Sequence, residues 1–180
     1  MIVLNGPPGC GKSTLARMYT DEHPLALNLG IDRVRSLIGR WRDDPHAAGL
    51  LARAIALAAA RAHLAAGHDV VIPQFLGRLA FLEQAEQVAE QAGASFHEIV
   101  LLDTKENAVR RYTQRTGAED GPARVEDQEM IRQRVGPAEL SAMYDRLMSV
   151  IAARPAARVV PTSSGQIDGA YRDFLRSLTS

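Results

Sequence analysis

The chain has 180 residues, of which 46% are hydrophobic and 23% charged, and its 21 basic and 21 acidic residues give a formal net charge of zero. This composition is ordinary for a globular protein, and the length predicts a single domain spanning residues 1–180. The balanced charge argues against non-specific binding to nucleic acid, which needs a net basic face. Because there is one cysteine, neither an intrachain disulfide nor a multi-cysteine metal site can form.

The first predicted element is an apolar strand over residues 2–4, which runs directly into the sequence GPPGCGKS. This is the phosphate-binding P-loop pattern, G-x-x-x-x-G-K-[ST], between a strand and a helix expected from Ser13 to about residue 21. Glycines turn backbone N–H groups toward phosphate oxygens, the lysine reaches the β- and γ-phosphates, and the serine hydroxyl ligates Mg²⁺. The sequence therefore predicts that ATP is held by Gly6, Pro7, Pro8, Gly9, Cys10, Gly11, Lys12, Ser13 and Thr14.

Residues 25–29 form a short extended run, and a brief helix follows Gly30. Asp32 comes directly after this run, and ligands of open α/β sheets bind at the carboxyl ends of strands. We therefore expect the Asp32 carboxylate to face the same edge as the P-loop. It can accept a proton from an attacking hydroxyl, or hold Mg²⁺ through water, and it can also cap the helix.

An arginine cluster around Trp41 follows Asp32 and includes Arg35, a candidate for binding the acceptor. The cluster can receive an anionic or aromatic acceptor or stack on a base, and a plain surface patch is an equal alternative. The pair Asp44-Pro45 predicts the start of a helix that ends at Gly67. The longest apolar stretch, 54–66, lies in this helix and contains charged and polar side chains, so we expect no membrane span and a cytoplasmic protein.

A strand predicted over 69–72 runs into Pro73-Gln74. Gln74 can offer a hydrogen bond to the acceptor, or can simply end the strand. Helical spacing continues to Gly93, and a strand covers 96–102. Asp103 is predicted to cap the next helix, and a Mg²⁺-binding carboxylate at the end of the strand is the alternative. Five strands, the last at 158–160, alternate with helices, which indicates an α/β fold whose parallel sheet is covered on both faces.

Arg111 and Arg115 lie four residues apart on one face of the helix after Asp103, and they precede a polar segment, 115–127, expected to be a small mobile lid. Arginines placed there can neutralise charge that develops on a transferred phosphoryl group, although a solvated face paired with nearby acids is an alternative. A stripe of apolar residues follows Gly136-Pro137 and predicts another helix: Leu140, Met143, Tyr144, Leu147, Met148 and Ile151.

The P-loop, the Gly-Ile-Asp-Arg sequence at residues 30–33 and the arginine-bearing helix resemble the small P-loop kinases. Within these, the chain resembles the AAA-type kinases that include chloramphenicol phosphotransferases, zeta toxins and tunicamycin-resistance-type ATP-binding proteins. The resemblance implies a P-loop NTPase fold in which Asp32 is the base for the acceptor hydroxyl and Arg111 or Arg115 acts on the phosphoryl group. The Pro73-Gln74 sequence departs from relatives that carry an acid there.

The expected function is a kinase that moves the γ-phosphate of Mg-ATP onto a hydroxyl of a small molecule, such as an antibiotic, a nucleoside or a nucleotide sugar. Catalysis is assigned to Lys12, Asp32, Arg111 and Arg115, acceptor binding to Arg35 and Gln74, and Mg²⁺ binding to Ser13 and Asp32. A polynucleotide 5′-hydroxyl kinase is one alternative, less favoured because the chain has no net charge. An ATP-binding resistance or switch protein without phosphotransfer is another.

Overall fold

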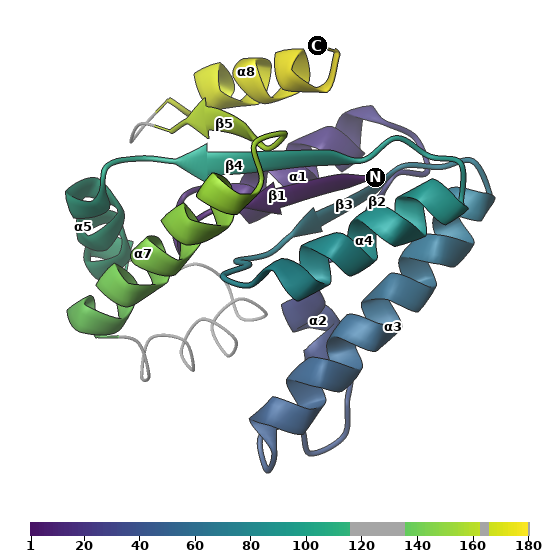
Figure 1. Cartoon of the computed structure of the whole chain (residues 1–180), viewed down its shortest axis with the longest axis horizontal. Coiled ribbons are helices and arrows are strands. Elements are labelled where there is room, and N and C mark those ends of the chain that lie inside the picture. Colours follow the sequence, from purple (N-terminus) through teal and green to yellow (C-terminus); the bar gives the residue numbers. More distant parts are fainter. Residues whose placement is uncertain (116–135, 163–165, 180) are drawn as a thin grey trace.

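The structure is a computed structural model that describes residues 1–115, 136–162 and 166–179. One sheet of five parallel strands crosses the molecule in the order β2-β3-β1-β4-β5 (Figure 1). Its central strand, β1, lies between β3 and β4, so the P-loop leaves the sheet at the middle of its carboxyl edge. The strands are β1 (Ile2–Asn5), β2 (Leu27–Asn28), β3 (Val70–Pro73), β4 (His97–Leu102) and β5 (Arg158–Pro161).

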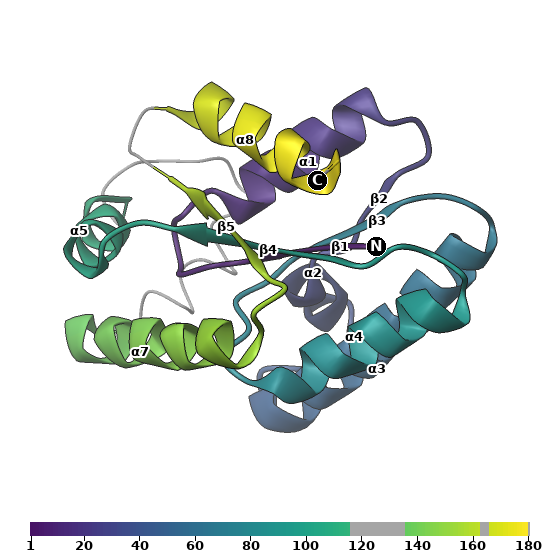
Figure 2. The ribbon, with the colours of Figure 1, turned by 45° about the horizontal axis from the view of Figure 1, so that its top comes forward.

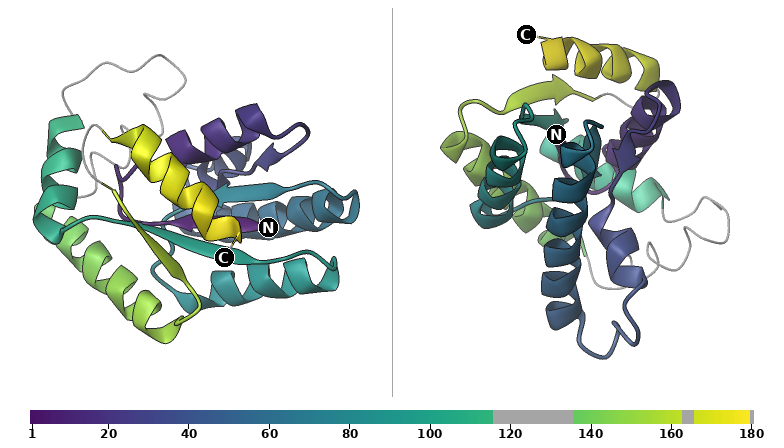
Figure 3. Two further views of the ribbon diagram at one scale, coloured as in Figure 1. Left: turned by 90° about the horizontal axis from the view of Figure 1, so that it is seen from above. Right: turned by 90° about the vertical axis from the view of Figure 1, so that its right-hand side faces the viewer.

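Helices cover both faces of the sheet, as the alternation of strands and helices predicts. In the turned views, α1 and α8 lie together on one face, and α3, α4 and α7 lie on the other (Figures 2 and 3). The described helices are α1 (Lys12–Glu22), α2 (Ile31–Ser36), α3 (Pro45–Ala65), α4 (Leu79–Gln91), α5 (Lys105–Arg115), α7 (Pro137–Ala153) and α8 (Ile167–Thr179).

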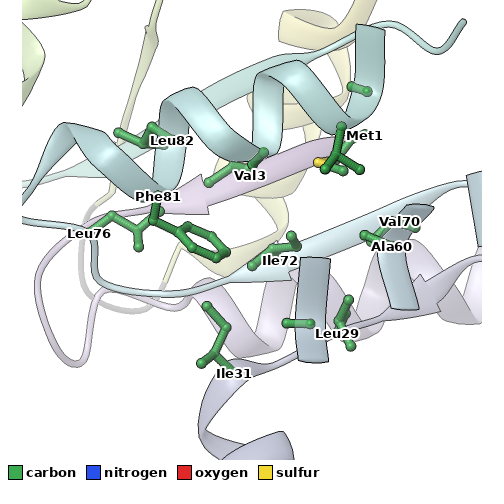
Figure 4. Close-up of a cluster of buried hydrophobic side chains, with 14 of the residues drawn as sticks. Met1, Val3, Leu29, Ile31, Ala60, Val70, Ile72, Leu76, Phe81 and Leu82 are labelled. Carbon is green, nitrogen blue, oxygen red and sulfur yellow. The ribbon is translucent and has the colours of Figure 1, made fainter. Parts of the chain in front are cut away.

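Alternating residues of the strands supply two separate cores, because successive side chains of a strand point to opposite faces. Val3 and Ile72 belong to the core beneath α3 and α4, where Leu76 and Phe81 lie beside them (Figure 4). Leu4 belongs to the other core, beneath α1 and α8. Ile31, at the start of α2, also packs into the first core. This contact fixes the short helix that carries Asp32 on the α3 side of the sheet.

The ends of the predicted helices mostly fall where their capping residues stand. The Asp44 carboxylate accepts a hydrogen bond from the Ala47 amide at 3.0 Å, and Gly67, with φ 84°, ends α3 in the left-handed conformation. The cap of α5 differs from the prediction. The Thr104 hydroxyl, and not Asp103, accepts the hydrogen bond from an amide of the first turn, that of Asn107. Thr104 is therefore the N-cap residue.

Among the described helices, α3 alone is long and apolar enough to cross a membrane, by length and composition. A row of alanines on one side of it, with Leu64, is buried in the core, and a third of its apolar window is buried. The expectation that this stretch is no membrane span stays a prediction. The apolar stripe of α7 is confirmed at Leu140 and Leu147, whereas Met148 is 41% exposed and Val150 is buried in its place.

Candidate active site

The P-loop curls where its glycines permit it. Gly6 has φ +145°, a conformation that residues with a side chain rarely adopt. A Cβ at this position would lie 2.5 Å from the Leu101 carbonyl oxygen and 2.7 Å from the Cys10 Sγ. Gly9 and Gly11 also have positive φ values, 81° and 102°. Positive φ at these three glycines gives the loop its curled shape, and glycine is needed at its first position.

Lys12 and the N-terminus of α1 place positive charge inside this loop. The Lys12 ammonium donates to the carbonyl oxygens of Gly6 and Pro7, each at 2.9 Å. Gly11 precedes α1 and brings no side-chain cap, so the first amides of the helix remain available to an anion. Ser13 is exposed on the first turn. These groups are donors that suit a chain of phosphates.

Asp32 lies on the second helix and is joined to an arginine one turn further on. Its Oδ1 is 3.0 Å from Nη2 of Arg35, whose side chain is 19% exposed. The guanidinium of Arg35 lies 4.8 Å from the centre of the Trp41 ring, and that of Arg42 lies 4.7 Å from it. Trp41 is 6% exposed, so its indole is a packed platform for arginines and is covered against stacking by a free base.

Gln74 follows β3, in the strand next to the P-loop strand. The backbone amide of Gln74 donates to the Leu4 carbonyl, which extends the hydrogen-bond ladder between β3 and β1 by one residue. Its side-chain Oε1 is buried and has no hydrogen-bond partner among the described residues, as is also true of Arg35 Nε. Buried polar atoms are normally paired, so these two atoms, like Oε1 of Glu98, are exceptions among the described residues.

The Asp103 side chain is hydrogen-bonded to residues at the start of α5. Its Oδ1 accepts from the Thr104 amide at 2.7 Å and from Nδ2 of Asn107 at 2.9 Å. Its carbonyl oxygen accepts from the Tyr144 hydroxyl of α7. The residue thus organises the start of α5, although it is not the cap. This environment favours a structural role over the Mg²⁺-binding alternative at the end of β4.

The predicted lid arginines are only partly described. Arg111 and Arg115 lie in α5 by their backbone, and their side chains lie outside the described part of the structure, as does nearly all of the segment 115–127. Sequence reasoning missed Asn5, a fully buried polar residue directly before the P-loop. An asparagine that interrupts the apolar run between Ile2 and Gly6 is the signal that could have drawn attention to it.

No cluster of three or more His, Cys, Asp or Glu side chains suited to a metal occurs among the described residues. A metal ion that enters with a nucleotide needs few protein ligands, since phosphates and water complete its shell. Ser13 on the first turn of α1 and Asp32 on α2 both follow strands at the carboxyl edge of the sheet. The donor set therefore fits Mg²⁺ bound to a triphosphate.

A P-loop between a central parallel strand and the following helix defines the P-loop nucleotide-binding fold. Residues 1–136 match the model of a family described as an AAA domain, and the chain belongs to this family. No curated protein sequence matches it.

Solved structures share the fold along nearly the whole chain. A gluconokinase from Sinorhizobium meliloti is similar at 16% identity and a TM-score of 0.63, over 99% of this chain and 90% of its own. A tunicamycin resistance protein of Deinococcus radiodurans is similar at 12% identity and a TM-score of 0.61, over 99% and 94% of the two chains. At these identities the likeness establishes the fold, and it agrees with the resemblance to small P-loop kinases.

Proposed function

We propose that the protein is a kinase that transfers the γ-phosphate of Mg-ATP to a hydroxyl group of a small molecule. The observation that carries the proposal is the placement of Asp32 at the same edge of the sheet as a complete P-loop, on a helix anchored by Ile31. Membership of the AAA domain family and the fold shared with a gluconokinase support it.

The residues of the P-loop would bind the triphosphate. The Lys12 ammonium would exchange the carbonyl oxygens of Gly6 and Pro7 for phosphate oxygens, and the open amides of α1 would hold the rest. Ser13 and Asp32 would hold Mg²⁺, Asp32 through water. When bound, the ion neutralises charge on the β- and γ-phosphates.

Asp32 would act as the base. Arg35 engages its Oδ1, while no described residue is hydrogen-bonded to Oδ2. One carboxylate oxygen is therefore held and the other is free to accept a proton. As the acceptor oxygen bonds to the γ-phosphorus, the bond from phosphorus to the bridging oxygen of ADP breaks and the hydroxyl proton passes to Asp32.

Gln74 and Arg35 would bind the acceptor. Gln74 Oε1 needs a donor and Arg35 Nε needs an acceptor, and a hydroxyl group can serve either. Arg111 and Arg115 remain the proposed source of positive charge for the phosphoryl group. A cytoplasmic location and a single domain over residues 1–180 remain parts of the same proposal.

The test is ADP release from Mg-ATP across antibiotics, nucleosides, nucleotide sugars and 5′-hydroxyl oligonucleotides, with wild type and Asp32→Asn side by side. We expect one acceptor class to stimulate turnover, and the variant to lose it while ATP affinity is unchanged. Asp43→Asn is the matched control, because Asp43 also pairs with an arginine three residues away, Arg40, at 2.6 Å. Its turnover should equal that of wild type.

Three results would argue otherwise. Turnover that survives in Asp32→Asn would remove Asp32 as the base. Stimulation by oligonucleotides alone would favour the polynucleotide kinase. ATP binding without stimulation by any acceptor would favour a nucleotide-binding protein without phosphotransfer, which the amide at position 74 in place of an acid also supports.

A further inference from the structure

Asn5, the last residue of β1, places a polar side chain in the interior, with 0% of its surface exposed. Its amide makes three hydrogen bonds. Oδ1 accepts from the Gly6 and Leu76 amides, both at 2.8 Å, and Nδ2 donates to the Leu76 carbonyl at 3.0 Å. An unpaired amide would be costly to bury, so these bonds explain why asparagine is tolerated at this position.

Two of these bonds join Asn5 to Leu76, 71 residues away in the sequence, and the third joins Asn5 to its neighbour Gly6. One partner, Gly6, is the first residue of the P-loop. The other, Leu76, lies in the connection between β3 and α4, residues 74–78, which we name the β3–α4 loop. A single oxygen accepts from both amides, so a displacement of the Gly6 amide that keeps its bond to Asn5 acts on the hydrogen bonds from Asn5 to Leu76.

The β3–α4 loop is also held by the hydrogen bond from the Gln74 backbone amide to the Leu4 carbonyl and by packing. Leu76 is 4% exposed and lies in the core beside Phe81 (Figure 4). A Cβ on Gly77 would lie 3.0 Å from the Phe75 ring and 3.4 Å from the Arg146 Cβ of α7. Leu76 and Gly77 are therefore closely packed, directly after Gln74 and Phe75.

We propose that Asn5 is a positioning residue that couples nucleotide binding in the P-loop to the conformation of the β3–α4 loop. Phosphates that engage the Gly6–Ser13 loop fix the Gly6 amide, Asn5 transmits this constraint to Leu76, and the loop that carries Gln74 is held more firmly in the conformation that binds the acceptor. The inference rests on the proposed function, because it requires a nucleotide in the P-loop. Coupling of this kind is reciprocal, so an acceptor bound at Gln74 would tighten nucleotide binding by the same factor.

Amide hydrogen exchange tests this without knowledge of the acceptor. The full chain is compared with and without Mg²⁺ and a non-hydrolysable ATP analogue, and exchange is followed in peptides that cover the P-loop and the β3–α4 loop. In wild type we expect exchange in both peptides to slow, by about fivefold or more in the β3–α4 loop.

Asn5→Asp is the informative variant. An aspartate can still accept from the Gly6 and Leu76 amides, but an ionised carboxylate cannot donate to the Leu76 carbonyl and instead sets an oxygen against it, which repels Leu76. We expect it to keep protection of the P-loop and lose protection of the β3–α4 loop. Asn5→Ser serves if Asn5→Asp does not fold, because its shorter hydroxyl side chain can reach Gly6 but not Leu76. Glu98→Ala is the control for loss of stability, since Glu98 is a buried polar residue opposite Val3, away from the P-loop.

The outcomes separate the two proposals. A wild type in which the analogue protects neither peptide overturns both the proposed function and the coupling. Protection of the P-loop alone in wild type overturns the coupling and leaves nucleotide binding intact. Equal protection of the β3–α4 loop in wild type and Asn5→Asp would also overturn the coupling, because the nucleotide would then act on the loop directly. Uncoupling in Glu98→Ala would show that lost stability suffices, which overturns the role of Asn5.

Discussion

Asp32 and Arg35 are joined across one turn of α2, with Oδ1 of the carboxylate 3.0 Å from Nη2 of the guanidinium. Arg35 is itself held over the buried ring of Trp41. A carboxylate held by an arginine that is fixed in this way has few rotamers to choose from. The pair thus orients the proposed base before an acceptor arrives, and this leads to the first prediction.

Arg35→Ala should lower acceptor-dependent turnover by about tenfold to a hundredfold, because a reacting group displaced by about an ångström loses that much rate. Nucleotide affinity should remain within about twofold of wild type, since Arg35 lies outside the P-loop. Steady-state kinetics and a titration with an ATP analogue measure the two effects. Arg40→Ala is the control, because Arg40 is 88% exposed and pairs with Asp43. Equal loss of turnover in both variants would contradict the prediction.

Lys12→Ala should weaken binding of Mg-ATP by roughly tenfold to a hundredfold, because a hydrogen bond to a charged group contributes about 1.5–3 kcal/mol. The chain provides its own control in Lys105, the second of its two lysines, which pairs with Asp145 at 2.8 Å. Lys105→Ala should bind the nucleotide as wild type does. Isothermal titration calorimetry measures the affinity of both variants for the nucleotide. Equal affinities of Lys12→Ala and Lys105→Ala would count against the P-loop as the nucleotide site.

Gly6→Ala should abolish nucleotide binding and lower the free energy of unfolding. The new methyl group would meet the Leu101 carbonyl oxygen at 2.5 Å, and φ +145° is strained for alanine. Gly39→Ala is the matched control, because a Cβ there meets nothing within 4 Å. Urea denaturation and nucleotide titration of both variants provide the comparison. A Gly6→Ala protein that binds ATP normally would show that the loop does not bind it in the described conformation.

Arg154→Ala should lower the free energy of unfolding by about 3–5 kcal/mol, because it strips a buried carboxylate of its partner. Arg154 Nε donates to Glu98 at 2.8 Å and Nη1 donates to Glu86 at 2.7 Å. Glu98 is 5% exposed, and burial raises the pKa of its carboxyl while Arg154 opposes the rise. Urea denaturation of wild type and variant at neutral pH measures the loss.

The pH dependence follows from the direction of that pKa. A carboxyl whose pKa is higher in the folded state contributes stability below its unfolded pKa, and this contribution is lost as pH rises through the folded pKa. Without Arg154 the pKa of Glu98 should rise further, so the deficit of the variant should grow as pH rises above the ordinary pKa of a glutamate, about 4.3. Glu98→Gln in the same background should remove this growth. A deficit that is independent of pH would refute the assignment.

Several features could be predicted because they depend on residues close together in the sequence. The P-loop needs contiguous glycines, a lysine and a serine, and Asp44 and Gly67 cap α3 through local hydrogen bonds and local backbone conformation. The family and the parallel sheet are confirmed as well. The roles of Asp32, Gln74, Arg111 and Arg115 remain predictions, since the fold positions a residue without showing what it binds.

The local sequence by itself determined the phosphate loop, the alternation of strands and helices and most helix ends, because each depends on backbone preferences within a few residues. Only the tertiary structure decided the strand order, the pairing of Glu98 with Arg154 and the bonds between Asn5 and Leu76. These contacts join residues far apart in the chain, and many partners satisfy the same local pattern. Burial selects among them, because a polar group in the core must find its hydrogen bonds there.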